Sequence, residues 1–219
     1  MVLSQIEAEK LAKIDHFMRD TLASDQSGHD SSHIDRVLAL AKKILINEPQ
    51  ADEFIVLAAA TLHDTYDDKL FKDPAAAKNK LAEFLQSISV DSQSMFEIID
   101  NMSWSAQVFG HHKTLDINGQ IVQDADRLEA IGAIAIIRTF KYGFAHDQID
   151  YDPAIKPRDL KSKSEYRNER QPILNHFYEK LFKIKDSLNT ETAKKLAVKR
   201  DKFMHDFVAE YLAEYQLKA

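Results

Sequence analysis

Residues 58–64 of the chain read AAATLHD, an apolar run that ends on a histidine and an aspartate side by side. The composition of this region predicts a helix from about Ala51 to Asp64. A charged side chain at the end of a buried face is costly unless something pairs with it. A divalent metal ion is a natural partner, because imidazole nitrogen and carboxylate oxygen together suit a borderline cation.

The rest of the chain predicts an all-α protein. Only five glycines and five prolines interrupt its 219 residues, and apolar residues recur mostly at three- and four-residue spacing. This length suits one domain with a substantial core. We expect a single domain over 1–219, a helical bundle with a core at about 25–142 and C-terminal helices at 171–219 packed on that core.

A long polar segment separates these two parts. It runs from about residue 143 to residue 170 and is too long for an ordinary connector in a compact domain, so it is a long polar loop or a small helical lobe. Two interpretations stay open: a lid that covers an anionic substrate, or a solvated charged loop. The basic residues of the segment are Arg158, Lys161, Lys163, Arg167 and Arg170.

Composition narrows the classes of partner. A formal net charge of −6 argues against a broad nucleic-acid surface, although clustered positive charges could still bind a phosphorylated small molecule. The absence of cysteine excludes disulfides, thiolate zinc sites and cysteine nucleophiles. No apolar run approaches membrane-spanning length. We expect a cytoplasmic protein, a monomer or homodimer, that binds neither nucleic-acid polymers nor membranes.

Three regions far apart in the sequence each direct one metal-competent side chain inward. His33 shares a helical stripe with Val37, and His63 ends the apolar run described above. Asp126 lies in the apolar segment 123–141, which predicts one central buried helix. A hydrolytic metal needs such a set with positions left open for water and substrate. The expected ligands are His33, His63, Asp64 and Asp126.

The dipeptide His-Asp carries no weight by itself. It occurs four times, at 29–30, 63–64, 146–147 and 205–206. Only the second follows an apolar run and has an inward histidine before it and an inward aspartate after it. The alternative is a structural histidine satisfied inside the core.

Three segments together carry a family resemblance. Residues 28–37 read GHDSSHIDRV, residues 62–69 read LHDTYDDK and residues 123–133 read QDADRLEAIGA. In this order they resemble the HD-domain metal-dependent phosphohydrolases, above all the small single-domain HD hydrolases of bacteria and fungi. The resemblance implies an all-helical fold and one divalent ion on the four residues named above. Manganese is the first candidate, and cobalt, nickel, magnesium or zinc are the others.

The resemblance also implies hydrolysis of a phosphoester or phosphoanhydride bond in a small phosphorylated substrate, most often a nucleotide, by metal-activated water. Asp67 follows His63 by four residues, so it would face the water as general base if the helix continued for one more turn. The alternative for Asp67 is an Asx turn. Lys69 and Arg36 are the candidates for holding the phosphate, against ordinary surface roles.

Further candidates for substrate contact lie farther along the chain. His29, Arg138 and Lys180 could each touch substrate, whereas Arg127 is expected to pair with an acid such as Asp124. Two other functions stay open. One is a nucleotide-binding sensor without turnover. The other is a dinuclear iron oxygenase, for which the only spare histidines are His29, His111 and His112.

Overall fold

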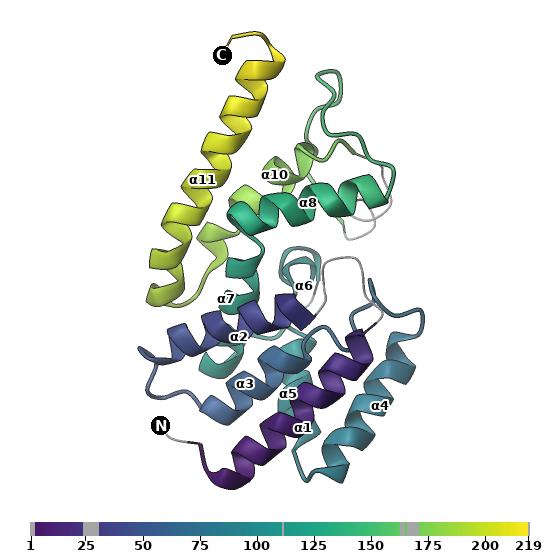
Figure 1. Ribbon diagram of the computed structural model, residues 1–219, viewed down its shortest axis with the longest axis vertical. Helices are drawn as coiled ribbons and strands as arrows, with labels where there is room; N and C mark the ends of the chain where they lie inside the picture. The colour runs from purple at the N-terminus through teal and green to yellow at the C-terminus, as the bar shows by residue number, and fades with distance from the viewer. Residues whose placement is uncertain (1–2, 24–30, 111, 163–164, 166–170, 219) are drawn as a thin grey trace. The chain divides into compact units, whose positions relative to one another are not determined.

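The computed structural model describes residues 3–23, 31–110, 112–162, 165 and 171–218, and this part of the chain contains helices and no strand (Figure 1). The predicted all-α class is confirmed. None of the helices described there has both the length and the apolar composition required to cross a bilayer. The chain divides into two compact units, Met1–Asp126 and Arg127–Ala219. That both units form one domain stays a prediction.

The first unit is built around α3. Its helices are α1 (Gln5–Leu22), α2 (Ser31–Leu45), α3 (Glu53–Leu62), α4 (Pro74–Ser87), α5 (Ser92–Ile99), α6 (Trp104–Phe109) and most of α7 (Ile117–Glu129). Figure 1 shows α3 between α1 and α2, and α3 also packs on α5. Every residue from Val56 to Leu62 is buried, which explains why this helix is apolar on all sides.

The third helix is shorter than the sequence predicts. Asp52 caps its N-terminus by accepting a hydrogen bond from the backbone N–H of Ile55, and the helix ends at Leu62 with His63 as its C-cap. The histidine and the aspartate of the AAATLHD stretch therefore lie just beyond the last helical turn, where the chain is free to change direction.

The predicted single helix over 123–141 is wrong. The structure has two helices there, α7 and α8 (Ala133–Ala145), joined at Gly132. Gly132 has φ +99° and ψ −164°, a conformation open essentially to glycine alone. Ile137 is also 70 % exposed, so the apolar residues of this segment are not all buried.

The second unit combines α8 with shorter elements and one long helix. These elements are α10 (Asn175–Glu179), the 3₁₀ turns η1 (Leu181–Lys183) and η2 (Lys185–Ser187), and α11 (Glu191–Tyr215). Its aromatic core joins Phe140 of α8, Phe177 of α10 and Phe207 of α11, with ring centroids 6.1–6.3 Å apart. Each ring is contributed by a different helix, so these contacts hold the unit together.

The long polar segment is anchored inside this second unit. Arg158 donates hydrogen bonds from its backbone N–H, Nε and Nη2 to the carboxylate of Glu179, at 2.9–3.0 Å. Glu179 is only 2 % exposed. Arg158 therefore fastens the segment to α10, whereas Lys163, Arg167 and Arg170 lie outside the described residues. The lid over 143–170 stays a prediction.

Replacing Gly132 by alanine should destabilise the fold. A Cβ at this position would lie 3.1 Å from Cγ of Arg200, and the positive φ would strain any L-residue. We expect Gly132→Ala to lower the free energy of unfolding by about 1–3 kcal/mol, measured by urea denaturation. Ile137→Ala, on an exposed position of the same helix, should change it by less than about 0.5 kcal/mol. Equal effects would contradict the backbone explanation.

Removing the guanidinium of Arg158 should destabilise the second unit. Arg158→Ala leaves the buried carboxylate of Glu179 without that partner, and breaking a buried ion pair from one side costs about 3–5 kcal/mol. The measurement is urea denaturation combined with the rate of proteolysis within 146–162. Lys156→Ala, an exposed lysine of the same segment, is the matched control. An Arg158→Ala protein as stable as this control would show that the ion pair does not anchor the segment.

Candidate metal centre

The four predicted ligands meet in the first unit. Nε2 of His33 lies 3.5 Å from Oδ2 of Asp64 and 3.5 Å from Oδ1 of Asp126. Nε2 of His63 lies 3.5 Å from Oδ1 of Asp64 and 3.7 Å from Oδ1 of Asp126. Ligand atoms bound at about 2.1 Å to one ion are separated by about 3–4 Å, so these spacings suit a shared cation.

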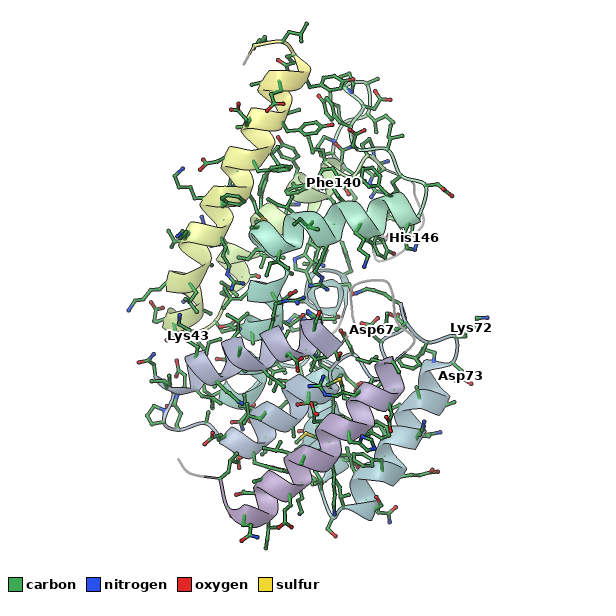
Figure 2. The ribbon with its side chains drawn as sticks, in the orientation of Figure 1. Lys43, Asp67, Lys72, Asp73, Phe140 and His146 are labelled. Atoms are coloured by element: carbon green, nitrogen blue, oxygen red, sulfur yellow. The ribbon has the colours of Figure 1, made fainter. Side chains whose placement is uncertain are left out.

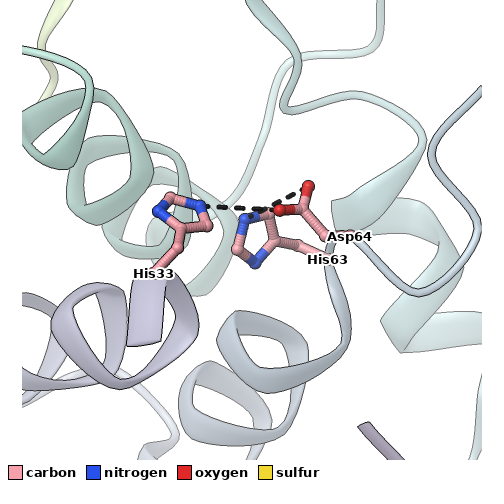
Figure 3. A group of neighbouring side chains, drawn as sticks. All are labelled: His33, His63 and Asp64. Carbon is pink, nitrogen blue, oxygen red and sulfur yellow. Dashed lines mark ion pairs between the residues drawn. The ribbon is translucent and has the colours of Figure 1, made fainter. Parts of the chain in front are cut away.

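Different helices supply these side chains. His33 lies in the first turn of α2, His63 and Asp64 directly follow α3, and Asp126 belongs to α7. Figure 3 shows His33 and His63 converging on Asp64, and their ligand atoms all lie within 4.8 Å of one another. Both histidines and Asp64 are buried. The packing of α2 on α3 thus sets the distance between the two imidazoles.

His63 is oriented by its own helix. Its Nδ1 lies 2.8 Å from the backbone oxygen of Ala60 and can donate to that carbonyl, which leaves Nε2 as the ligand atom. Nε2 is buried and has no hydrogen-bond partner among the described residues. A buried polar atom without a partner is costly, and a cation at this point would remove that cost.

The charges of the site also favour a cation. Burial by itself lowers the pKa of His63, but the carboxylates of Asp64 and Asp126 outweigh burial and raise it to about 10. Burial by itself raises the pKa of Asp126, yet attraction from the neighbouring imidazoles of His33 and His63 holds it well below its ordinary value. Two carboxylates therefore demand positive charge, and protonated imidazole or a divalent ion can supply it.

Asp67 and Lys69 adopt the alternative local structure. Because α3 ends at Leu62, Asp67 lies in a turn (Figure 2). The further helical turn, on which the predicted direction of Asp67 depended, does not form. Oδ1 of Asp67 accepts a hydrogen bond from the backbone N–H of Lys69 at 2.8 Å, which is an Asx turn. Nζ of Lys69 lies 3.8 Å from Oδ2 of Asp67. The carboxylate is still partly exposed and close to an ammonium group.

The predicted substrate contacts are spread over both units. Arg36, on α2 one turn after Ser32, donates from Nη1 to the Ser32 hydroxyl at 3.1 Å. His29 lies outside the described residues. Arg138 and Lys180 belong to the second unit, where Arg138 donates to the buried carboxylate of Glu129 and Lys180 follows α10.

Two other expectations are clarified. Arg127, expected to pair with an acid, donates from Nη1 to the backbone oxygen of Ser187 at 2.6 Å. Of the spare histidines, His111 lies outside the described residues and His112 is exposed. Within the described part of the chain, the acidic and histidine groups that could hold an ion reduce to the group of His33, His63 and Asp64, which Asp126 approaches.

Sequence reasoning missed Tyr66, which lies between Asp64 and Asp67. Its hydroxyl donates to Oδ1 of Asp100 at 3.0 Å, across 34 residues of chain. No spacing rule links positions so far apart, so only the structure could reveal this contact.

Similar proteins and solved structures place the chain in a family, although no family model matches it. The Bacillus subtilis (strain 168) protein YpgQ is 34% identical over 207 residues, 93% of each chain. A crystal structure of YpgQ in complex with ADP matches with a TM-score of 0.72 and 31% identity over 96% of both chains.

Two further crystal structures are also similar. One, from Lactobacillus plantarum, has a TM-score of 0.88 and 40% identity over 99% of this chain and 100% of that one. The other is an HD-superfamily hydrolase from Bacillus thuringiensis, with a TM-score of 0.74 and 39% identity over 96% of this chain and 98% of that one. Together with a buried group of histidine and aspartate suited to a cation, these likenesses show that the chain belongs to the HD superfamily of metal-dependent hydrolases.

Proposed function

We propose that this hydrolase cleaves a phosphoester or phosphoanhydride bond of a small phosphorylated substrate, and that the substrate is a nucleotide. The observation that carries the proposal is that the Nε2 atoms of two buried imidazoles each lie 3.5–3.7 Å from an oxygen of Asp64 and an oxygen of Asp126. The ADP bound by YpgQ supports the nucleotide, because that protein is similar over nearly the whole chain.

In this proposal His33, His63, Asp64 and Asp126 hold one divalent ion. Two imidazoles and two carboxylates suit manganese, cobalt, nickel or zinc, and magnesium less well, since it prefers oxygen ligands. Manganese remains our first candidate. The bound ion would supply Lewis acidity, which makes water a stronger acid and neutralises charge on a phosphoryl oxygen.

Asp67 is the proposed general base. A carboxylate that receives a proton must be reachable by water, and the side chain of Asp67 is 22 % exposed. Its Oδ1 is occupied by the Lys69 N–H, so Oδ2 is the oxygen on which we place the incoming proton. Lys69 lies 3.8 Å from that oxygen. An anionic phosphate would draw the ammonium of Lys69 toward itself and so leave Oδ2 able to accept the proton.

The remaining substrate contacts stay predictions. Arg36 belongs to the helix that carries His33, so it can act on the phosphate without any change in α2. Contacts from His29, Arg138 and Lys180, the cytoplasmic location and the state as monomer or homodimer are likewise predictions. For Arg138, the ion pair with Glu129 must be broken or shared before the guanidinium can bind a phosphate.

Metal binding should depend on the buried group. We expect manganese at about 100 times its dissociation constant to stabilise the wild-type protein by about 2.7 kcal/mol. His63→Ala should weaken the affinity by more than about 100-fold, because it removes a ligand and leaves the carboxylates facing each other. Isothermal titration and thermal unfolding with each candidate ion measure both effects. His16→Ala, at an exposed histidine of α1, should bind metal like the wild type, and equal affinity of both variants would contradict the site.

Turnover should depend on Asp67 and on the ion. We expect Asp67→Asn to lower kcat by about 10²–10⁴-fold while metal affinity stays near that of the wild type, because the residue accepts a proton and is not a ligand. Asp68→Asn, the neighbouring exposed acid, is the matched control. The assay uses nucleoside mono-, di- and triphosphates and a generic phosphate ester, with products separated by chromatography. Release of pyrophosphate or of orthophosphate identifies the bond that is cleaved.

The same assay tests the alternative functions. Nucleotide binding without turnover in any metal would favour a sensor and contradict the proposed reaction. Two irons per chain, with oxygen consumption and no phosphate release, would favour the oxygenase.

A further inference from the structure

Tyr66 lies at the centre of a side-chain network outside the proposed metal centre. It is buried, and it separates Asp64, two residues earlier, from Asp67, the next residue. Its hydroxyl donates a hydrogen bond to Oδ1 of Asp100, at 3.0 Å.

Asp100 occupies an unfavourable position for a carboxylate. It is the C-cap of α5, where the helix presents its negative end and a cation would be preferred. Lys78 of α4 offsets this cost, because its Nζ donates to Oδ2 of Asp100 at 2.5 Å. The two carboxylate oxygens thus serve different partners, one the lysine and the other Tyr66. The lysine offsets the cost of a carboxylate at this position, and the other carboxylate oxygen accepts the hydrogen bond that holds the hydroxyl of Tyr66.

The ring of Tyr66 is fixed as well. It meets Phe96 of α5 edge to face, with centroids 5.8 Å apart and planes at 82°. Nζ of Lys78 lies 4.5 Å from the centroid of Phe96 and 5.4 Å from that of Tyr66, within the range of cation–π attraction. Both the ring and the hydroxyl are therefore held by α4 and α5.

Asp67 has no comparable support of its own. Within the described residues, its carboxylate contacts only the backbone N–H and the ammonium group of Lys69. Its direction therefore follows the backbone of the turn. The far end of that turn is held by Leu70 and Phe71, which pack against Met18, Leu22 and Ile34. The near end is held by Tyr66.

We infer that Tyr66, held by Asp100 and Lys78, is a positioning residue that directs the carboxylate of Asp67. The inference rests on the proposed function insofar as Asp67 acts as general base. Asp64 is held separately, because the next residue, Thr65, bonds back to the oxygen of Leu62 through both its N–H, at 3.0 Å, and its hydroxyl, at 2.7 Å. Loss of the Tyr66 hydroxyl should therefore disturb Asp67 much more than metal binding.

The first test needs no turnover. Tyr66→Phe removes one hydroxyl and keeps the ring. Amide hydrogen exchange at residues 69–71, whose N–H groups bond to Asp67, should become about 5- to 10-fold faster. Exchange in α1 and α2 should not change. Tyr211→Phe is the matched control, since it removes a tyrosine hydroxyl that also donates to an aspartate, Asp150, in the second unit. Unchanged exchange at 69–71 would overturn the inference.

The second test is kinetic. Tyr66→Phe should lower kcat by about 10-fold with KM and manganese affinity within about twofold of the wild type, and it should have no further effect in an Asp67→Asn background. Asp100→Ala should act like Tyr66→Phe, whereas Asp100→Asn, whose amide oxygen still accepts the hydrogen bond, should restore most of kcat. Additive losses with Asp67→Asn, or no rescue by asparagine, would overturn the positioning role.

Failure of the proposed function gives a different result. If the wild type hydrolyses no phosphorylated substrate with any metal, the proposed function and the catalytic part of this inference both fail. Faster exchange at 69–71 in Tyr66→Phe would then still support the tyrosine as the support of the turn. If the wild type turns over and Tyr66→Phe has normal kcat, the inference alone fails.

Discussion

The site in the first unit depends on the negative charge of two carboxylates, Asp64 and Asp126, which apolar side chains and backbone groups cannot neutralise. Asp64 and Asp126 approach the Nε2 atoms of His33 and His63 within 3.5–3.7 Å, and both histidines and Asp64 are buried. Coulomb attraction is stronger in such surroundings than in water, so this group favours a positive charge among its atoms. The all-apolar helix α3 ends directly at this group and carries its histidine–aspartate pair.

Helical periodicity was sufficient to predict much of this site. His33 and Asp126 share stripes with apolar residues, and those stripes do turn toward a common interior. Periodicity failed where a helix stops. The sequence does not show that α3 ends at Leu62, because the apolar character of the segment is set by burial and not by helix length. Asp67 therefore lies in an Asx turn, which local hydrogen bonding of aspartate favours.

The arginines illustrate another limit of sequence reasoning. A guanidinium near buried acids can bind a substrate phosphate or satisfy the fold, and the sequence is the same in both cases. In the second unit Arg158 serves Glu179, Arg127 serves the oxygen of Ser187 and Arg138 serves Glu129. The partners lie 60 residues away in one case and 21 in another, so spacing could not identify them. The break at Gly132, where φ is +99°, also escaped prediction, because the composition of residues 123–141 does not show where the backbone turns.

The boundary between the two units falls between Asp126 and Arg127, inside a continuous helix. A polypeptide severed at that peptide bond would end in Asp126 itself, with its backbone oxygen replaced by a charged terminal carboxylate and its last turn frayed. The two units can therefore not be separated by a cut at this boundary without disturbing Asp126, one of the proposed ligands.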